Sequence, residues 1–217
     1  MSYHYKDIYR ILIPGIVLFF VLQYLIKDNS SLMESLIPED TTNKAVFYVF
    51  FIPIAGFLLG FVNNFLSALC EKVVYLIIPR PSRILLRDSE QKHLICLSPN
   101  TIKSLKSKVD NLKINKEMST EDAYNVFSVA NQHLKERNEI IETNYNYMIF
   151  ARNMFLPSIG ITYMIWLLVD CSSCPCQYRW IIYILSFVII LLFQLLAWQW
   201  YSYQHTKYIL VDYANLK

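Results

Sequence analysis

Four apolar windows, each long enough to cross a membrane, dominate the pattern of hydrophobic and polar positions along the chain. They are Ile8–Ile26, Ala45–Ala68, Tyr147–Val169 and Trp180–Trp200, and each contains at most one charged residue. Because a hydrocarbon core of about 30 Å requires about twenty apolar helical residues, the pattern predicts four transmembrane helices. A soluble all-helical protein is the alternative, which the uncharged window at 180–200 disfavours.

The second apolar window continues beyond the length of one span. Residues 45–79 contain only two charged side chains. A straight helix of this length measures about 52 Å. We therefore expect it to cross the membrane and to continue past the membrane face, unless Pro53 bends it. Pro79 and Pro81 cannot donate a helix hydrogen bond, so they predict the end of the helix.

Two helical patterns follow in the stretch between the second and third windows. Helix signals return at Ser98, and an apolar stripe follows at Ile102, Leu105, Val109 and Leu112. A further helix begins at Ser119, with no proline or glycine before Pro157, which predicts a stalk continuous with the third span. Asn138 interrupts its apolar stripe, either to fix register or oligomer number or as a solvent-facing residue. The segment His93–Leu97 is short and apolar enough for a strand.

Positive charge in the connecting segments gives the expected orientation. The connections at 27–44 and 170–179 carry few cations, whereas the central segment carries many, so both termini and the centre are expected in the cytosol. The sequence thus predicts an all-α membrane protein with four transmembrane helices and a mainly helical cytosolic domain inserted between spans two and three. The expected parts are residues 1–79 (spans one and two with outer loop 27–44), 80–146 (basic helical cytosolic domain and stalk) and 147–217 (spans three and four with a cytosolic tail).

Small and polar residues inside these windows are candidates for a pore or for helix packing. The pattern Gly56-xxx-Gly60 allows helices to approach closely and predicts packing between chains. The full candidate set is Gly56, Gly60, Asn63, Asn64, Glu71, Arg152 and Gln194. Polar groups in lipid are costly and usually face protein or water. Two interpretations stay open: a hydrated path or gate, or interhelical hydrogen bonds with one Glu71–Arg152 pair.

A cationic stretch follows the second window. Between Arg80 and Lys116 there are nine basic and three acidic residues, a local excess of +6. The candidate ligand-binding residues are Arg80, Arg83, Arg87, Lys92, Lys103, Lys106 and Lys113. From their position, the first two are expected to meet anionic lipid headgroups. If chains assemble symmetrically, the lysines form a basic face that suits a polyanion such as an oligonucleotide; otherwise they form a solvated face.

The remaining composition excludes several chemistries. All four glycines lie in the predicted spans, so no glycine-rich phosphate loop is expected. The four histidines are scattered and no catalytic set is visible, so we expect neither an enzyme nor a cofactor or metal site. Cys171, Cys174 and Cys176 lie in an expected outer loop, where a structural disulfide or plain thiols are favoured over a metal because no fourth ligand stands nearby.

The layout of four spans, a small basic helical insert and no catalytic motif resembles the membrane effectors of bacterial antiphage systems. Among these, the Hailong type is similar because it pairs a tetrameric channel with an oligonucleotide signal made by a partner nucleotidyltransferase. The resemblance lies in the layout, and no functional residue is carried over. It implies a homo-oligomer, with a tetramer as the favoured form, in the bacterial inner membrane, and antiviral defence by membrane depolarisation.

Two functional hypotheses therefore stand beside each other. The first is an oligomeric ion channel in the lipid bilayer, gated by an anionic ligand or a partner at its basic cytosolic domain. The second is a non-conducting membrane scaffold or sensor that recruits a cytosolic partner protein. An integral-membrane enzyme acting on lipid is the weakest alternative, because it lacks visible catalytic residues.

Overall fold

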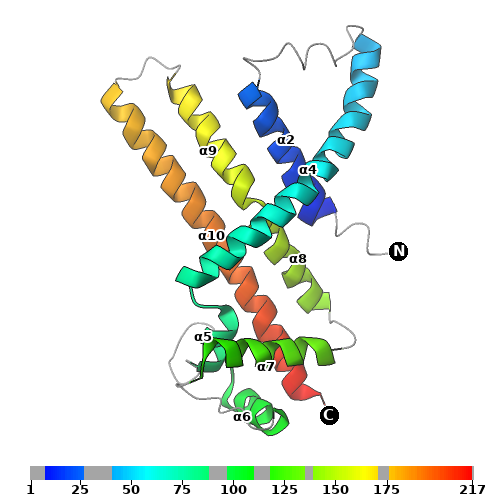
Figure 1. Ribbon diagram of the computed structural model, residues 1–217, viewed down its shortest axis with the longest axis vertical. Coiled ribbons are helices and arrows are strands. Elements are labelled where there is room, and N and C mark those ends of the chain that lie inside the picture. The colour runs from blue at the N-terminus through cyan, green and yellow to red at the C-terminus, as the bar shows by residue number, and fades with distance from the viewer. Residues whose placement is uncertain are drawn as a thin grey trace. The chain divides into compact units, whose positions relative to one another are not determined.

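Every element in the described part of the chain is a helix (Figure 1). The computed structural model describes residues 8–26, 41–87, 97–109, 118–134, 139–170 and 176–216. The elements are η1 (Ile8–Leu12), α2 (Ile13–Ile26), α4 (Thr41–Ile77), α5 (Pro81–Arg87), α6 (Pro99–Lys108), α7 (Thr120–His133), α8 (Glu139–Asn153), α9 (Phe155–Asp170) and α10 (Cys176–Asn215). This confirms the all-α class. The strand expected at His93–Leu97 lies, apart from its last residue, outside the described residues.

Among the described residues, three helical stretches are long and apolar enough to cross a membrane: Tyr48–Leu86, Glu139–Leu167 and Trp180–Asn215. They correspond to the second, third and fourth apolar windows of the sequence. The first window forms a shorter apolar helix, Ile8–Tyr24. Three of the four expected spans therefore have helices of spanning length and composition, which indicates association with a membrane, and the first span stays a prediction.

The chain divides into two compact units, each described by itself. Unit 1 comprises residues 1–70 and 149–197, and unit 2 comprises residues 71–148 and 198–217. The division differs from the expected one at the C-terminus, because residues 198–217 group with the central segment and not with the last spans. The boundaries fall inside α4, α8 and α10.

Glycines bring α2 and α4 of unit 1 into backbone contact, and Figure 1 shows the two helices crossing. A Cβ atom on Gly15 would overlap the Gly56 carbonyl oxygen, and one on Gly60 would overlap the Ile11 carbonyl oxygen. At Gly56 an added Cβ would lie 2.5 Å from Ile16 Cγ1. The close approach that the Gly56-xxx-Gly60 pattern predicts is confirmed. The partner within the chain is the first apolar segment, residues 8–26, and packing between chains through these glycines stays a prediction.

Unit 1 also packs α2 against α9. Here a Cβ on Gly160 would overlap Val21 Cγ1, so a small residue is again placed where α2 approaches. Phe19 adds an edge-to-face contact with Phe51 of α4, with ring centroids 5.9 Å apart. Helix α2 thus touches both α4 and α9, although it is the shortest of the apolar segments.

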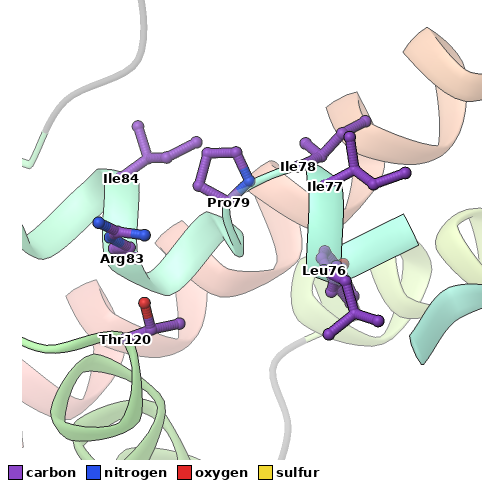
Figure 2. A pocket seen from close by; sticks show the side chains of 8 residues that line it. Leu76, Ile77, Ile78, Pro79, Arg83, Ile84 and Thr120 are labelled. Carbon is purple, nitrogen blue, oxygen red and sulfur yellow. The ribbon is translucent and has the colours of Figure 1, made fainter. Parts of the chain in front are cut away.

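In unit 2 a break separates α4 from α5 (Figure 2). The last helical bond of α4 runs from the Ile78 N–H to the Val74 carbonyl at 2.8 Å. Pro79 lies outside any helix, and Pro81 is the first residue of α5. Proline is favoured at a helix start because that position needs no N–H donor. Pro81 therefore begins α5, whereas the sequence pattern predicted only that this proline ends the preceding helix.

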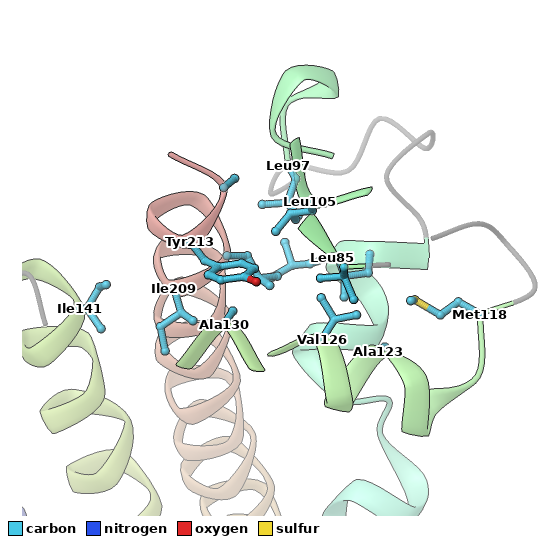
Figure 3. Close-up of a cluster of buried hydrophobic side chains, with 14 residues drawn as sticks. Leu85, Leu97, Leu105, Met118, Ala123, Val126, Ala130, Ile141, Ile209 and Tyr213 are labelled. Atoms are coloured by element: carbon cyan, nitrogen blue, oxygen red, sulfur yellow. The ribbon is translucent and has the colours of Figure 1, made fainter. Parts of the chain in front are cut away.

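A hydrophobic cluster forms the core of unit 2 (Figure 3). Leu85 and Leu86 of α5 meet Leu105 of α6, while Ala123, Val126 and Ala130 of α7 pack beside them. The C-terminal end of α10 contributes Ile209, Leu210, Tyr213 and Ala214 to the same cluster. The predicted stripe of α6 is thereby confirmed at Leu105 and Val109, whereas Leu112 lies outside the described residues. The C-terminal residues that the sequence pattern predicted to form a tail are therefore part of a folded core.

The helices of unit 2 begin where the sequence predicts, but one of them ends early. The Ser98 and Ser119 hydroxyls cap α6 and α7 by accepting the Thr101 and Asp122 N–H groups at 3.1 Å and 3.0 Å. Helix α7 stops at His133, and Leu134 has ψ 89°, outside the helical range. The continuous stalk is therefore wrong. Leu134 packs against the core cluster, and this burial overrides a sequence without helix breakers. Asn138 lies outside the described residues.

Gly60→Ala is expected to destabilise the protein. Alanine favours a helix by about 1 kcal/mol over glycine, but its Cβ would meet the Ile11 backbone, and overpacking costs about 1–3 kcal/mol. Backbone cannot move aside as a flexible side chain can, so the melting temperature in detergent micelles should fall by several degrees. Leu58→Ala, at a side chain 63% exposed, is the control and should change it little. An unchanged or higher melting temperature for Gly60→Ala would contradict the α2–α4 contact.

Candidate functional site

A proline in the third apolar stretch leaves a backbone carbonyl without its helical partner, and a buried asparagine supplies a replacement. The N–H of residue 157 would normally bond the Asn153 carbonyl, but Pro157 has no N–H. The Asn63 side-chain amide of α4 donates to that carbonyl at 2.6 Å. Asn63 is completely buried. Its side chain thus satisfies the carbonyl that Pro157 exposes and joins α4 to α8.

The same arrangement recurs at the start of the chain. Pro14 lacks the N–H that would bond the Arg10 carbonyl, and η1 precedes it as a short π-helix. The Asn153 side-chain amide donates to the Arg10 carbonyl at 2.6 Å. Asn153 is also completely buried. One asparagine therefore accepts a bond on its backbone and donates a bond from its side chain, and the two bonds connect α4, α8 and η1.

Two further polar contacts extend this set within unit 1. The Arg152 guanidinium donates from Nη2 to Asn64 Oδ1 at 2.6 Å. Gln194 of α10 donates from Nε2 to the Ala151 carbonyl. We call Asn63, Asn64, Arg152, Asn153 and Gln194 the polar cluster. It brings α4, α8 and α10 together by side-chain hydrogen bonds.

The geometry of the polar cluster agrees with both interpretations of the sequence. Each member joins two helices, as the packing interpretation requires. The cluster also holds an arginine, which is always charged, and Asn153 Oδ1 is buried without a hydrogen-bond partner among the described residues. A charge and an unsatisfied oxygen in an apolar unit are typical of functional positions. Glu71 belongs to unit 2, so its pairing with Arg152 stays a prediction.

Sequence reasoning placed Asn63, Asn64, Arg152 and Gln194 in the candidate site but left out the residues that explain their positions. Asn153, Pro14 and Pro157 were not among the candidates. A usable signal was present. A proline inside an apolar helix exposes the carbonyl four residues earlier, and a buried asparagine nearby is the natural donor.

The basic residues of α6 in unit 2 are of two kinds: some are exposed at the surface, and one bonds other parts of the fold. Lys103 and Lys106 are exposed on α6. Lys108, on the same helix, donates from Nζ to the Tyr213 carbonyl at 2.8 Å and to the Leu216 carbonyl. It thereby satisfies carbonyls at the C-terminal end of α10, where a cation is favoured. The exposed pair remains available to a ligand, while Lys108 holds α6 to α10.

The two arginines after α4 have different surroundings. The Arg80 guanidinium lies 4.6 Å from the ring centroid of Tyr124 and 5.6 Å from that of Tyr75, a cation–π arrangement. The Arg83 side chain lines a pocket at the break between α4 and α5. The side chains of Arg87, Lys92 and Lys113, and those of the disulfide candidates Cys171, Cys174 and Cys176, lie outside what the structure describes.

No group of three or more His, Cys, Asp or Glu side chains that could hold a metal is found among the described residues. Comparison of the chain with protein-family models, with curated proteins and with solved structures found no match. The functional conclusion therefore rests on the residues of this chain.

The pairing of Asn63 with the Asn153 carbonyl can be tested by a double-mutant cycle. Asn63→Leu leaves the carbonyl without a donor, so the free energy of unfolding in mixed micelles should fall by about 1 kcal/mol. In a Pro157→Ala background the new N–H can bond the same carbonyl, and Asn63→Leu should then cost little.

The matched control uses the other proline of the long helix. Pro53 is exposed in α4, so Pro53→Ala should leave the cost of Asn63→Leu unchanged. Equal costs of Asn63→Leu in the wild-type and Pro157→Ala backgrounds would contradict the assignment.

Proposed function

We propose that the protein is an oligomeric membrane effector that conducts ions through a path containing the polar cluster. In this proposal the chain crosses the bacterial inner membrane four times, with Ile8–Tyr24 as the first span and both termini in the cytosol. Unit 2, which contains the central segment and the C-terminal residues, forms the cytosolic part. Several chains, with four as the favoured number, surround a common axis. Opening depolarises the membrane as an antiviral response.

The observation that carries the proposal is the charged and amide-rich cluster inside an apolar unit. An ionised side chain within a membrane-spanning segment is costly unless it faces protein or water. The Arg152 guanidinium donates from Nη2 to the Asn64 side chain, so a permanent charge belongs to the polar cluster. Asn64 and Arg152 are only half-buried, which supports their contact with a hydrated path.

The helix breaks beside the cluster support a gate. Helix α8 ends at Asn153, and α9 begins at Phe155, because Pro157 removes one bond of the ladder. The flanking bonds persist, with the Met154 N–H on the Phe150 carbonyl at 2.9 Å and the Ser158 N–H on the Met154 carbonyl at 2.9 Å. A helix that lacks one backbone hydrogen bond bends at lower cost than an intact helix. A change in bend would move Arg152 and Asn153 together.

Control by a cytosolic ligand is supported by the exposed lysines of α6. A ligand opens or closes the path only if it binds one state more tightly than the other. Lys103 and Lys106 are exposed three positions apart on one helix, the spacing at which side chains are neighbours. In a symmetric assembly this pair would be repeated once per chain, which suits an oligonucleotide or another polyanion.

The alternative function is a non-conducting membrane scaffold that recruits a cytosolic partner protein. It is favoured by the bonds of the polar cluster, because each one ends on another helix of the same chain. A scaffold needs those bonds only for packing. The two functions differ in whether the cluster meets water and whether ions pass.

Purified protein in liposomes should release a potassium gradient, and Asn64→Leu combined with Gln194→Leu should lower the ion flux severalfold. The reason is that both substitutions replace half-buried amides of the proposed path by apolar side chains. The matched control is Gln23→Leu, at a half-buried glutamine of α2 outside the cluster. Equal flux in the double variant and the wild type, with all proteins reconstituted in equal amounts, would contradict the path.

Binding of a polyanion to α6 is tested with a fluorescein-labelled single-stranded RNA oligonucleotide and protein in detergent. The logarithm of the binding constant should fall linearly with the logarithm of the salt concentration, with a slope of about −0.7 for each phosphate contact. Lys103→Met with Lys106→Met should reduce that slope by about 1.4. Lys72→Met with Lys207→Met removes the same charge from other helices and should not reduce it. An unchanged slope in the α6 variant would mean that these lysines are only solvated.

A further inference from the structure

A pocket lies at the break between α4 and α5 in unit 2, and it has a volume of about 420 Å³. Figure 2 shows Leu76, Ile77 and Ile78 on the end of α4 and Arg83 and Ile84 on α5, on the two sides of Pro79. The complete lining is Tyr75, Leu76, Ile77, Ile78, Pro79, Arg83, Ile84 and Thr120. Leucine, isoleucine and proline side chains make up most of this lining, and Arg83 adds one cation beside the polar groups of Tyr75 and Thr120.

The aliphatic side of the pocket is exposed to an unusual degree. Leu76 is 85% exposed and Ile77 is 82% exposed, at the end of a helix whose preceding turns are apolar enough to cross a membrane. Leaving a leucine or isoleucine in water forgoes about 1.5–3 kcal/mol of burial for each residue. An acyl chain or the upper hydrocarbon of a lipid would cover both side chains at the level where the span ends.

The cationic side is formed by Arg83. Its guanidinium makes no hydrogen bond or ion pair with any residue in the described part of the chain, although the side chain is half-buried. Neighbouring Arg80 differs, because the rings of Tyr75 and Tyr124 hold it. A guanidinium with its donors available matches the geometry of a phosphate group, which it can bind with two parallel hydrogen bonds.

We propose that this pocket binds one anionic phospholipid, with the phosphate on Arg83 and the acyl region against Leu76, Ile77 and Ile84. The charge of Arg83 and the exposed aliphatic side chains of Leu76 and Ile77 favour this occupant over a nucleotide. Nucleobases bind on aromatic faces, but the one aromatic lining residue, Tyr75, already packs against Trp198 at 5.5 Å between centroids and against Arg80. The site goes beyond ion conduction and does not depend on it.

The bound lipid would contact the folded core of unit 2 through one short helix. Arg83 and Ile84 of α5 are followed directly by Leu85 and Leu86, which are 1% and 0% exposed in the core cluster. Helix α5 packs in turn on α7. A lipid on the outer side of α5 would therefore stabilise the arrangement of α5 on α7, so unit 2 would be more stable in anionic membranes.

The test measures lipid retention by native mass spectrometry of the full-length protein released from detergent micelles. The probes are phosphatidylglycerol and phosphatidylcholine with identical acyl chains, each added at the same ratio to protein. We expect the wild type to retain one phosphatidylglycerol in preference to phosphatidylcholine. Arg83→Gln should weaken that retention about fivefold, which corresponds to about 1 kcal/mol for one cation at an anionic surface. Lys103→Gln should not weaken it.

Two more variants keep the test decisive if Arg83→Gln folds poorly. Arg83→Lys keeps the charge and should retain more phosphatidylglycerol than Arg83→Gln. Ile77→Asn removes exposed apolar surface and should weaken retention of the lipid without removing charge. Equal retention of the two lipids by the wild type would overturn the proposal, as would equal weakening by Lys103→Gln. Displacement of the lipid by a single-stranded RNA oligonucleotide that itself requires Arg83 would assign the pocket to a nucleic acid instead.

Discussion

Backbone carbonyls inside an apolar helix must find a donor, because lipid offers none, and this constraint organises unit 1. Pro14 and Pro157 each break the ladder and expose a carbonyl four residues earlier. Asn153 provides the donor for the first, and Asn63 for the second. The two bonds fix which helices meet, since each donor must reach one particular oxygen. Gly15, Gly56 and Gly60 belong to the same packing, because a Cβ at each of them would lie within 2.5 Å of an atom of the facing segment.

Unit 2 depends on a different interaction, the burial of the C-terminal end of α10. Ile209 and Leu210 are fully buried among residues of α5, α6 and α7, and Lys108 bonds the final carbonyls of α10 from α6. Residues far apart in the sequence therefore close one core. Within this core His205 is also buried, with Nδ1 3.2 Å from the Ile141 carbonyl. The central segment alone would lack a large part of these contacts.

Periodicity and capping predicted the local structure well, whereas the partners of each element needed the folded chain. The apolar windows gave the long helices, and the serines at 98 and 119 cap the helices that were expected after them. The pattern at Gly56 predicted a close approach but not its partner, since no sequence rule pairs it with Gly15. The end of α7 at Leu134 was missed because it follows from packing against the core and not from a helix-breaking residue. The polar cluster was found in part, since polarity marks a side chain but not the carbonyl it will meet.

Whether the polar cluster meets water separates a conducting assembly from a scaffold, and thiol labelling measures this directly. In a cysteine-free background, Asn64→Cys and Leu58→Cys place one thiol each on α4, at a half-buried position of the cluster and at a position 63% exposed among apolar residues. A water-soluble thiol reagent reacts with the thiolate, which forms in water and not in lipid. A hydrated path predicts rapid labelling at residue 64 and little at residue 58 in native membranes. Labelling at residue 64 no faster than at residue 58 would contradict the proposed path.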